Sequence, residues 1–175
     1  MGLKEYDKKR DFSKTPEPKS SVKKEHKKRI FVVQRHDASH LHFDFRLEDE
    51  GVLKSWAVPK GPSMNASDKR LAIMVEDHPL DYAGFEGEIP KGEYGGGTVK
   101  IWDSGTWEPD KEHQNVESAL KQGALDFFLH GKRLQGEFIL IKTNYKDTKN
   151  SWMLKKKNDK YAIEDFYDAS EISPK

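Results

Sequence analysis

The chain has 175 residues, which suits one domain and leaves little room for a second. Hydrophobic residues make up only 34%, but 9 Phe, 6 Tyr and 4 Trp supply one compact core and argue against disorder throughout. Cysteine is absent, which excludes disulfides, thiolate metal sites and cysteine nucleophiles, so any metal site has to use His, Asp and Glu. No apolar run is long enough to span a membrane and no secretory signal is present, so we expect a cytoplasmic monomer without membrane contact.

The charge is unevenly distributed, although the formal net charge is only +1. Residues 1–29 carry eleven Lys or Arg and five Asp or Glu, whereas the remaining 146 residues carry twenty and twenty-five. This asymmetry predicts a basic N-terminal arm, residues 1–29, that packs partly on a mildly acidic domain, residues 30–175. A basic arm suits a polyanion such as nucleic acid, but a solubilising tail explains the lysines equally well.

The arm is expected to lack regular structure, because Pro16 and Pro18 allow neither a helix nor a central strand to continue. Strands are predicted next at residues 30–34, 41–47, 52–58 and 71–76, from their β-branched, aromatic and alternating side chains. The clearest alternation places apolar side chains on one face of a strand and polar ones on the other, namely Leu41, Phe43, Phe45 and Leu47 against His42, Asp44 and Arg46.

A glycine-rich segment at residues 84–97 precedes a second set of elements. It lacks the spacing of a phosphate-binding loop, so we expect a bulge or tight turn there. Strands 98–102 and 105–107 are predicted around a turn, and a helix over 116–122 between an Asn115 N-cap and Gly123. With further strands at 125–129, 137–143 and 151–155, the pattern favours a closed barrel or a sandwich.

One short stretch combines residues that bind metals. His36, His42 and Asp44 offer two nitrogen ligands and one carboxylate, and the last two share a strand face. Arg46 lies one step further along that face, where its guanidinium can fork onto an anionic oxygen held by the metal. A solvated surface histidine is the ordinary alternative, but such a concentration is unusual in a chain with seven histidines. We therefore predict a divalent-metal site.

Other polar residues are weaker candidates by themselves. His78 follows a predicted strand in the run Glu76–Tyr82, where loops commonly carry functional residues. Lys60 and Arg70 read as ordinary surface charge when each is considered alone.

The run HDASHLHFDFRLEDEGVLKSWAVPKGPS and the later RLAIMVEDHPLDYAGFEGEIPKGEYGGGTVKIWDSGTW closely resemble the 3′-phosphoesterase domain of bacterial ligase D, over about residues 8–158. His-x5-His-x-Asp-x-Arg with the later Glu-Asp-His-Pro is the specific part of the match. The resemblance implies a metal site, usually filled by manganese. We therefore predict a mostly all-β fold, a compact closed β-barrel of about eight strands with one or two short helices and an N-terminal arm. No polymerase or ligase region is present, so a stand-alone enzyme is expected.

The resemblance also assigns roles to individual residues. His36, His42 and Asp44 match the metal ligands, Arg46 and His78 match residues that hold the reacting phosphate, and Tyr82 matches an essential tyrosine. The remaining matches are Arg10, Asp11 and Glu17 in a functional N-terminal segment, and Gln34, Lys60, Arg70 and Glu76 as outer residues of the same pocket. His40 departs from the pattern, which more often has Arg there, and is not counted as a ligand.

The activity implied is repair of DNA 3′ ends. Members of the family remove a 3′-terminal ribonucleoside as phosphodiesterases and then hydrolyse the remaining 3′-phosphate as phosphomonoesterases, leaving a 3′-hydroxyl. The expected partners are DNA primer-template 3′ ends and a separate repair ligase and polymerase.

Two other functional classes stay open. His42, Asp44 and His78 also mimic the 2-His-1-carboxylate site of an oxygenase, although His36 is then unexplained. A non-catalytic DNA-end-binding module is the second, disfavoured because every matched motif residue is present.

Overall fold

The computed structural model describes residues 2–20, 28–145 and 149–174. Its strands are β1 Ile30–Asp37, β2 Leu41–Asp49, β3 Val52–Val58, β4 Arg70–Pro79, β5 Gly87–Ile89, β6 Gly97–Pro109, β7 Ala124–Gly131, β8 Gln135–Lys142 and β9 Ser151–Lys156. The α-helices in this part of the chain are α1 Lys4–Lys8 and α2 Val116–Gln122, and the short 3₁₀ turns are η1 Leu80–Gly84, η2 Lys111–His113 and η4 Ala169–Glu171. Residues 21–27 of the basic arm lie outside the described ranges.

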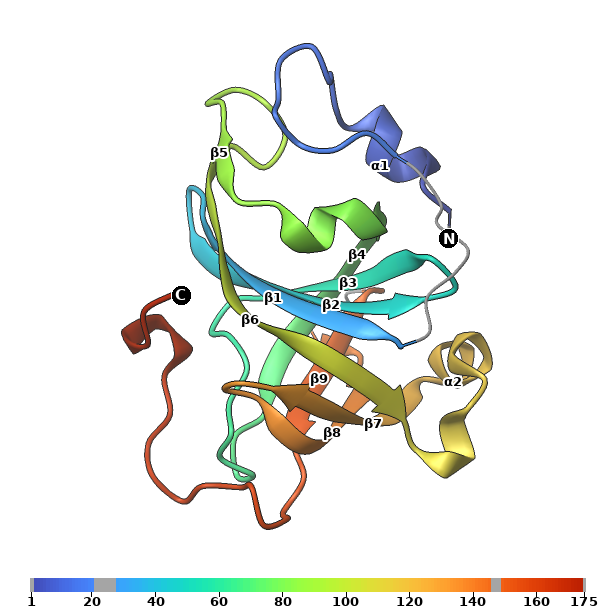
Figure 1. Ribbon diagram of the computed structural model, residues 1–175. Helices are drawn as coiled ribbons and strands as arrows, with labels where there is room; N and C mark the ends of the chain where they lie inside the picture. The colour runs from blue at the N-terminus through green and yellow to red at the C-terminus, as the bar shows by residue number, and fades with distance from the viewer. Residues whose placement is uncertain (1, 21–27, 146–148, 175) are drawn as a thin grey trace.

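Eight of the strands form a closed antiparallel barrel, as predicted. Their order is β1-β2-β3-β4-β9-β8-β7-β6, and β6 pairs with β1 to close the ring, while β5 adds to the start of β6 (Figure 1). Neighbours in the chain are mostly neighbours in the sheet, and turns of two or three residues connect β1 to β2, β2 to β3 and β7 to β8. Closure leaves no exposed edge in the barrel itself.

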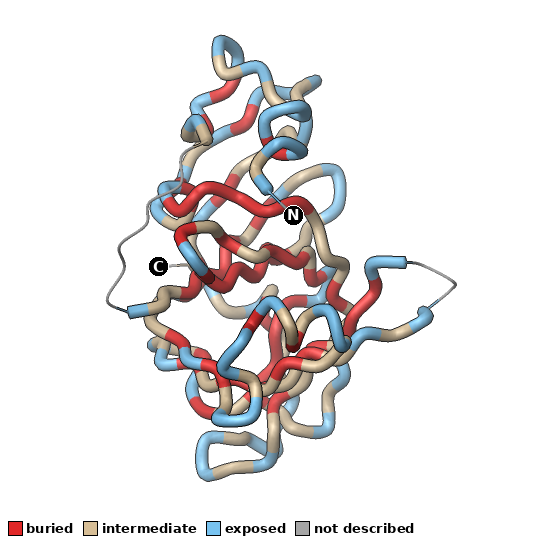
Figure 2. The backbone as a smooth tube through the Cα atoms, turned by 90° about the vertical axis from the view of Figure 1, so that its right-hand side faces the viewer, coloured by how far each residue is buried: buried red, intermediate tan, exposed pale blue. Residues whose placement is uncertain are grey.

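The main core fills the barrel interior. Phe43, Phe45 and Leu47 of β2 point into it, at most 1% exposed, and pack with Trp56 and Phe127 among others. The predicted alternation of β2 is therefore confirmed, and Figure 2 shows buried residues running along the strands in the middle of the molecule. Burying these large side chains contributes about 1.5–3 kcal/mol each before entropy is counted.

A second, smaller apolar cluster lies on the opposite face of β1–β3. It joins the N-terminal arm, η1 and β5 to the barrel wall, through Tyr6, Leu53, Leu80, Phe85 and Val99 among others. In Figure 1 these segments form a layer above the sheet. The polar face of β2, with His42, Asp44 and Arg46, points into the space between the two layers.

The helix predicted at 116–122 is present with both of its predicted caps. The Asn115 side chain accepts a hydrogen bond from the Ser118 amide, and Gly123 takes a left-handed conformation with φ 88°. Two local predictions were wrong. The arm is not wholly irregular, because α1 forms where Tyr6 packs on the outer cluster, and residues 98–107 form one continuous strand instead of two.

Long-range contacts explain the continuous β6. The register against β1 skips one residue, since Val33 pairs with Asp103 and Gln34 with Ile101, which indicates a β-bulge at Trp102. The buried Asp103 carboxylate then accepts hydrogen bonds from the amides of residues 132–134 in the β7–β8 turn. Asp-Ser-Gly resembles a turn locally, but its polar groups are used by a neighbouring hairpin.

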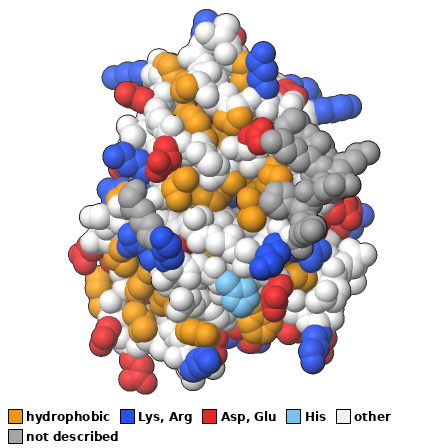
Figure 3. All heavy atoms as spheres, viewed as in Figure 1, with side chains coloured by type: hydrophobic (Ala, Val, Ile, Leu, Met, Phe, Trp, Pro, Cys, Tyr) orange, Lys and Arg blue, Asp and Glu red, His pale blue; other side chains and the backbone are white. Residues whose placement is uncertain are grey.

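None of the helices in the described ranges has the length and apolar character needed to cross a membrane. On the face shown in Figure 3, basic and acidic side chains are interspersed, with apolar side chains between them.

Candidate active site

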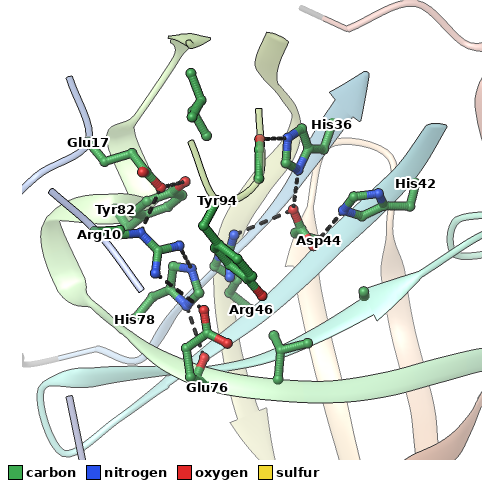
Figure 4. A pocket seen from close by; sticks show the side chains of 14 residues that line it. Arg10, Glu17, His36, His42, Asp44, Arg46, Glu76, His78, Tyr82 and Tyr94 are labelled. Atoms are coloured by element: carbon green, nitrogen blue, oxygen red, sulfur yellow. Dashed lines mark hydrogen bonds and ion pairs between the residues drawn. The ribbon is translucent and has the colours of Figure 1, made fainter. Parts of the chain in front are cut away.

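A pocket of about 290 Å³ opens between the outer face of the barrel and the arm (Figure 4). It collects residues that are far apart in the sequence, and its lining consists of Arg10, Glu17, His36, His42, Asp44, Arg46, Ala57, Val75, Glu76, His78, Tyr82, Ile89, Tyr94 and Gly95. Nine of the thirteen site residues that the sequence suggested line it directly.

His36, His42 and Asp44 form the compact group that the strand pattern predicted. One ligand atom from each lies within 4.8 Å of the others. His36 is paired with His42 across β1 and β2, and Asp44 lies two residues along β2, so all three point to the same face. The Asp44 carboxylate oxygens lie 3.4 Å from His36 Nδ1 and 3.3 Å from His42 Nε2.

Main-chain carbonyls fix the tautomers of both histidines. His36 Nε2 lies 2.6 Å from the Gly95 carbonyl oxygen, and His42 Nδ1 lies 3.2 Å from that of His40. A carbonyl only accepts, so these nitrogens carry the protons and the other nitrogen of each ring faces Asp44. Such outer partners are typical of metal-binding histidines. With both rings neutral, His36, His42 and Asp44 turn only lone pairs toward one another. Such an arrangement suits a cation between them.

The electrostatics keep Asp44 ionised. Burial alone raises the pKa of its carboxyl, but the Arg46 guanidinium and the two imidazoles outweigh burial and hold that pKa well below its usual range. The pKa of His42 is raised, since its contact with Asp44 outweighs the effect of burial. A carboxylate that stays charged is the form a metal ligand requires.

The Arg46 guanidinium is held through Nε and NH2, which leaves NH1 available as a donor. Its side chain is 3% exposed, Nε donates to Gln34 Oε1 at 2.8 Å, and NH2 lies 3.5 Å from Asp44. Gln34 in turn donates to the carbonyls of Tyr82 and Phe85, so β1 and η1 together orient the guanidinium. The buried NH1 has no hydrogen-bond partner among the described residues. Because an unsatisfied buried donor is costly, Arg46 is suited to an anionic ligand in the pocket.

His78 enters this site as a neutral ring. Its Nδ1 donates to the Glu76 carbonyl at 3.0 Å, which leaves the Nε2 lone pair 3.3 Å from Arg10 NH2. Burial, together with the Arg46 and Arg10 charges, lowers the pKa of His78 well below its ordinary value. His78 does not belong to the compact group of His36, His42 and Asp44.

The N-terminal arm contributes a buried ion-pair network. Arg10 Nε lies 2.9 Å from Glu17 and NH1 lies 3.3 Å from Glu76, and these three side chains are at most 4% exposed. Glu17 also accepts the Tyr82 hydroxyl at 2.6 Å. Burial raises the pKa of Tyr82, which keeps this phenol protonated as a donor. The arm residues 10–17 therefore form one side of the pocket.

Four of the suggested residues do not line the pocket: Gln34 accepts from Arg46 as described above, and the other three lie elsewhere. Asp11 is exposed and accepts hydrogen bonds from Ser13, so it shapes the arm and does not line the pocket. Lys60 and Arg70 are not outer residues of this pocket. They line a second hollow, together with residues 166–168, because β3 ends at Val58 and its continuation passes to the C-terminal segment. There Arg70 donates to the carbonyls of Gly61 and Tyr167.

Sequence reasoning missed four residues around the pocket. Tyr94 and Gly95 come from the glycine-rich segment, for which the sequence predicts only a bulge or tight turn, and Tyr6 and Lys9 come from the arm, which is predicted to lack regular structure. Lys9 bonds to Glu76 at 3.0 Å, and the buried Tyr6 ring lies 5.0 Å from that of His78. The sequence signal for these residues is an aromatic side chain in an otherwise polar segment, namely Tyr94 among glycines and Tyr6 among lysines.

Comparisons with known proteins agree with the motif. Residues 34–142 match the family described as the DNA ligase D 3′-phosphoesterase domain. The multifunctional non-homologous end joining protein LigD of Pseudomonas aeruginosa is 50% identical over 159 residues, covering 90% of this chain and 19% of that protein. The LigD DNA repair protein of Mycobacterium tuberculosis is 50% identical over 143 residues, covering 81% and 18%, and the LigD of Mycolicibacterium smegmatis is 44% identical over 144 residues, covering 79% and 19%.

These matches cover most of this chain, but the chain spans only about a fifth of the length of the relatives. The family match nevertheless covers more than half of the chain, including β2 and the His78 region. The chain therefore belongs to the DNA ligase D 3′-phosphoesterase domain family.

Proposed function

We propose that the chain is a manganese-dependent phosphoesterase that heals DNA 3′ ends. In this proposal it removes a 3′-terminal ribonucleoside and then the 3′-phosphate, leaving a 3′-hydroxyl. The observation that carries the proposal is the buried NH1 of Arg46, which has no hydrogen-bond partner in the part of the chain that the structure describes and lies beside the group of His36, His42 and Asp44. This combination offers a site for a cation and an adjacent site for an anionic oxygen.

The donor set fits a divalent transition metal. His36 Nδ1, His42 Nε2 and an Asp44 oxygen would hold it, since imidazole and carboxylate suit such ions. A bound divalent ion polarises a phosphoryl oxygen and lowers the pKa of a bound water. Manganese is our choice among these metals because of the family resemblance.

Both steps are hydrolyses at phosphorus. In the first, a water oxygen bonds to phosphorus, the bond to the 5′-oxygen of the terminal nucleoside breaks, and that oxygen takes a proton. In the second, water attacks the remaining phosphate, the bond to the 3′-oxygen breaks, and the protonated 3′-oxygen remains as the hydroxyl while inorganic phosphate leaves.

We assign the chain's own residues as follows. Arg46 holds a phosphoryl oxygen through NH1, with its orientation set by Gln34. His78 accepts from the Arg10 guanidinium through Nε2, and we assign it, together with Arg46, to the stabilisation of charge that develops on the phosphoryl oxygens. Arg10, Glu17, Glu76 and Tyr82 fix the side of the pocket that the arm forms.

The domain assignment is part of the same proposal. We treat residues 1–29 as an arm that completes the pocket and residues 30–175 as the phosphoesterase barrel. The longer relatives are named multifunctional non-homologous end joining proteins. We propose that this barrel works with a ligase and a polymerase on primer-template ends.

The oxygenase alternative loses its main support. It required His78 to join His42 and Asp44 as a ligand, but His78 packs against Tyr6 and Tyr82 and faces Arg10, while His36 completes the compact group. A non-catalytic binding module has no observation in its favour.

The test uses three DNA primers that differ only at the 3′ end, one with a single ribonucleotide, one with a 3′-phosphate and one with an ordinary 3′-hydroxyl. Products are separated by length and end group after incubation with manganese. We expect conversion of the first two to 3′-hydroxyl ends and no digestion of the third. Steady digestion of the all-DNA primer without preference would indicate a general exonuclease and refute the proposal.

A further inference from the structure

Tyr94 is a pocket residue without a role in the chemistry described above. Its side chain lines the pocket and yet is 46% exposed, the most exposed aromatic group in that lining. Figure 4 shows its ring, in that view, between the Arg10 and His78 side of the pocket and the Asp44 side. It therefore offers an exposed aromatic face to a molecule that occupies the pocket.

The backbone that carries Tyr94 is fixed on both sides. Two turns enclose it, since the Glu93 amide donates to the Pro90 carbonyl at 3.1 Å and the Gly96 amide to the Glu93 carbonyl at 3.0 Å. The next residue, Gly95, has φ 76° and accepts from His36. A ring on an already ordered backbone loses little conformational entropy when a ligand stacks on it.

The surroundings of Tyr94 are charged but balanced. Lys9 Nζ lies 4.8 Å and the Arg10 guanidinium carbon 5.3 Å from the ring centroid. Both cations are already paired with buried carboxylates, Lys9 with Glu76 at 3.0 Å and Arg10 with Glu17 at 2.9 Å. Among the residues that the structure describes, the charges at this end of the pocket thus balance, which suits an uncharged group with an aromatic face.

The remaining lining separates into two regions by chemistry. Arg46 and the group of His36, His42 and Asp44 serve one phosphoryl group. Ala57, Val75, Ile89 and Tyr94 add apolar lining. The volume of about 290 Å³ is close to the roughly 300 Å³ at which ligand pockets begin, and exceeds what a single phosphoryl group needs.

We infer that the Tyr94 ring stacks on the base of the 3′-terminal ribonucleoside that the diesterase step removes. A nucleoside is uncharged and presents a flat aromatic face, which matches this end of the pocket. Stacking of this kind tolerates all four bases, because every base has a π-face. The inference rests on the proposed function and adds to it a residue that distinguishes the two steps: Tyr94 serves the ribonucleotide end and is dispensable for the 3′-phosphate end.

The experiment removes the terminal base of the primer and the ring of Tyr94, separately and together. kcat/KM is measured for wild type and Tyr94→Ala on primers that end in a ribonucleotide, in an abasic ribose, or in a 3′-phosphate, and on a fourth primer that ends in a ribonucleotide but lacks the penultimate base. Tyr94→Phe keeps the ring, and Tyr145→Ala removes an equally exposed tyrosine, 49% exposed, that does not line the pocket.

We expect Tyr94→Ala to lower kcat/KM on the two primers that keep the terminal ribonucleotide base by about 5- to 150-fold, the range for one base–aromatic stack. Its effect on the abasic and 3′-phosphate primers should stay below about twofold, as for a group that no longer has a partner. Tyr94→Phe and Tyr145→Ala should behave as wild type does.

Three results would overturn the inference. An equal loss on all primers would mean that Tyr94 only holds the arm through Lys9 and Arg10. An unchanged rate on the ribonucleotide primer would show that the ring makes no useful contact. If Tyr94→Ala had no effect on the primer that lacks its penultimate base, the ring would stack on a base of the retained strand and not on the base that is released. Failure of the proposed function is a separate result, because wild type itself would then release neither nucleoside nor phosphate.

Discussion

Each of the three histidines around the pocket donates one ring proton to a main-chain carbonyl and turns its other nitrogen inward. Two of those nitrogens face Asp44 and the third, on His78, faces Arg10. Backbone groups move less than side chains, so the tautomers are set by the fold before any ligand arrives. In our proposal the same residue type thus serves as a metal ligand at two positions and as a neutral partner of Arg10 at the third.

Metal binding distinguishes His42 from its neighbour His40. His42→Ala removes a nitrogen that lies 3.3 Å from Asp44, whereas His40→Ala keeps the carbonyl that orients the His42 ring. We expect manganese affinity of His42→Ala, followed by electron paramagnetic resonance, to fall by more than the roughly 10–100-fold that loss of an outer partner costs. His40→Ala should bind as wild type does. Equal affinities for all three proteins would contradict the ligand assignment.

His78 gives the metal-free protein a defined pH dependence. Because its pKa is lowered in the fold, the unfolded chain takes up a proton below the unfolded value of about 6.5 while the folded chain does not. Stability contributed by the neutral ring is therefore lost as pH falls. Between pH 7 and 5, denaturant unfolding should show wild type losing about 2 kcal/mol more than His78→Gln. Parallel losses in the two proteins would mean that the folded ring is protonated.

At the scale of elements, β2 shows how much of the site a local pattern contains. A period of two placed His42, Asp44 and Arg46 on one face, and the structure has them there because the other face packs in the barrel. The β1–β2 register then adds His36 opposite His42. These residues were predictable because each depends on a neighbour close in sequence.

Other parts depend on contacts that no local pattern contains. Asp103 reads as a turn residue until the amides of the β7–β8 turn are seen around its carboxylate. Lys60 and Arg70 matched the family motif but lie in another hollow, since the direction of the chain after β3 is set by tertiary packing. Helix α1 has only five residues, too short to be stable alone, and forms where Tyr6 is completely buried.

The arm as an element is tested by a matched pair of substitutions. Arg10 and Lys8 lie close together in the arm, but the Arg10 side chain is 4% exposed and pairs with two buried carboxylates, while Lys8 is 72% exposed. Arg10→Gln leaves Glu17 and Glu76 buried without it, which should cost roughly 3–5 kcal/mol. Lys8→Gln should cost less than about 1 kcal/mol. Denaturant unfolding of both variants measures this, and equal stabilities would show that the arm does not pack as described.

At the scale of the whole molecule, barrel closure assembles the pocket. β6 pairs with β1 so that Asp37 lies opposite Thr98 and His36 opposite Val99, which brings the glycine-rich segment before β6 to the end of β1. The Gly95 carbonyl reaches His36 for this reason. The apolar core inside the barrel supports one wall of the pocket, and the second cluster holds the arm and η1 over it. The site therefore depends on the complete fold, while its chemistry lies on the outer face.

The most direct test of the account is the release of inorganic phosphate from a DNA primer with a 3′-phosphate, by wild type and by Asp44→Asn, with manganese and with a chelator. Asp44 is the carboxylate that two imidazoles and Arg46 share. We predict release by wild type only with manganese, and at least a roughly 100-fold lower kcat/KM for Asp44→Asn with an unchanged circular dichroism spectrum. Release by wild type in chelator, or full activity of Asp44→Asn, would contradict the account.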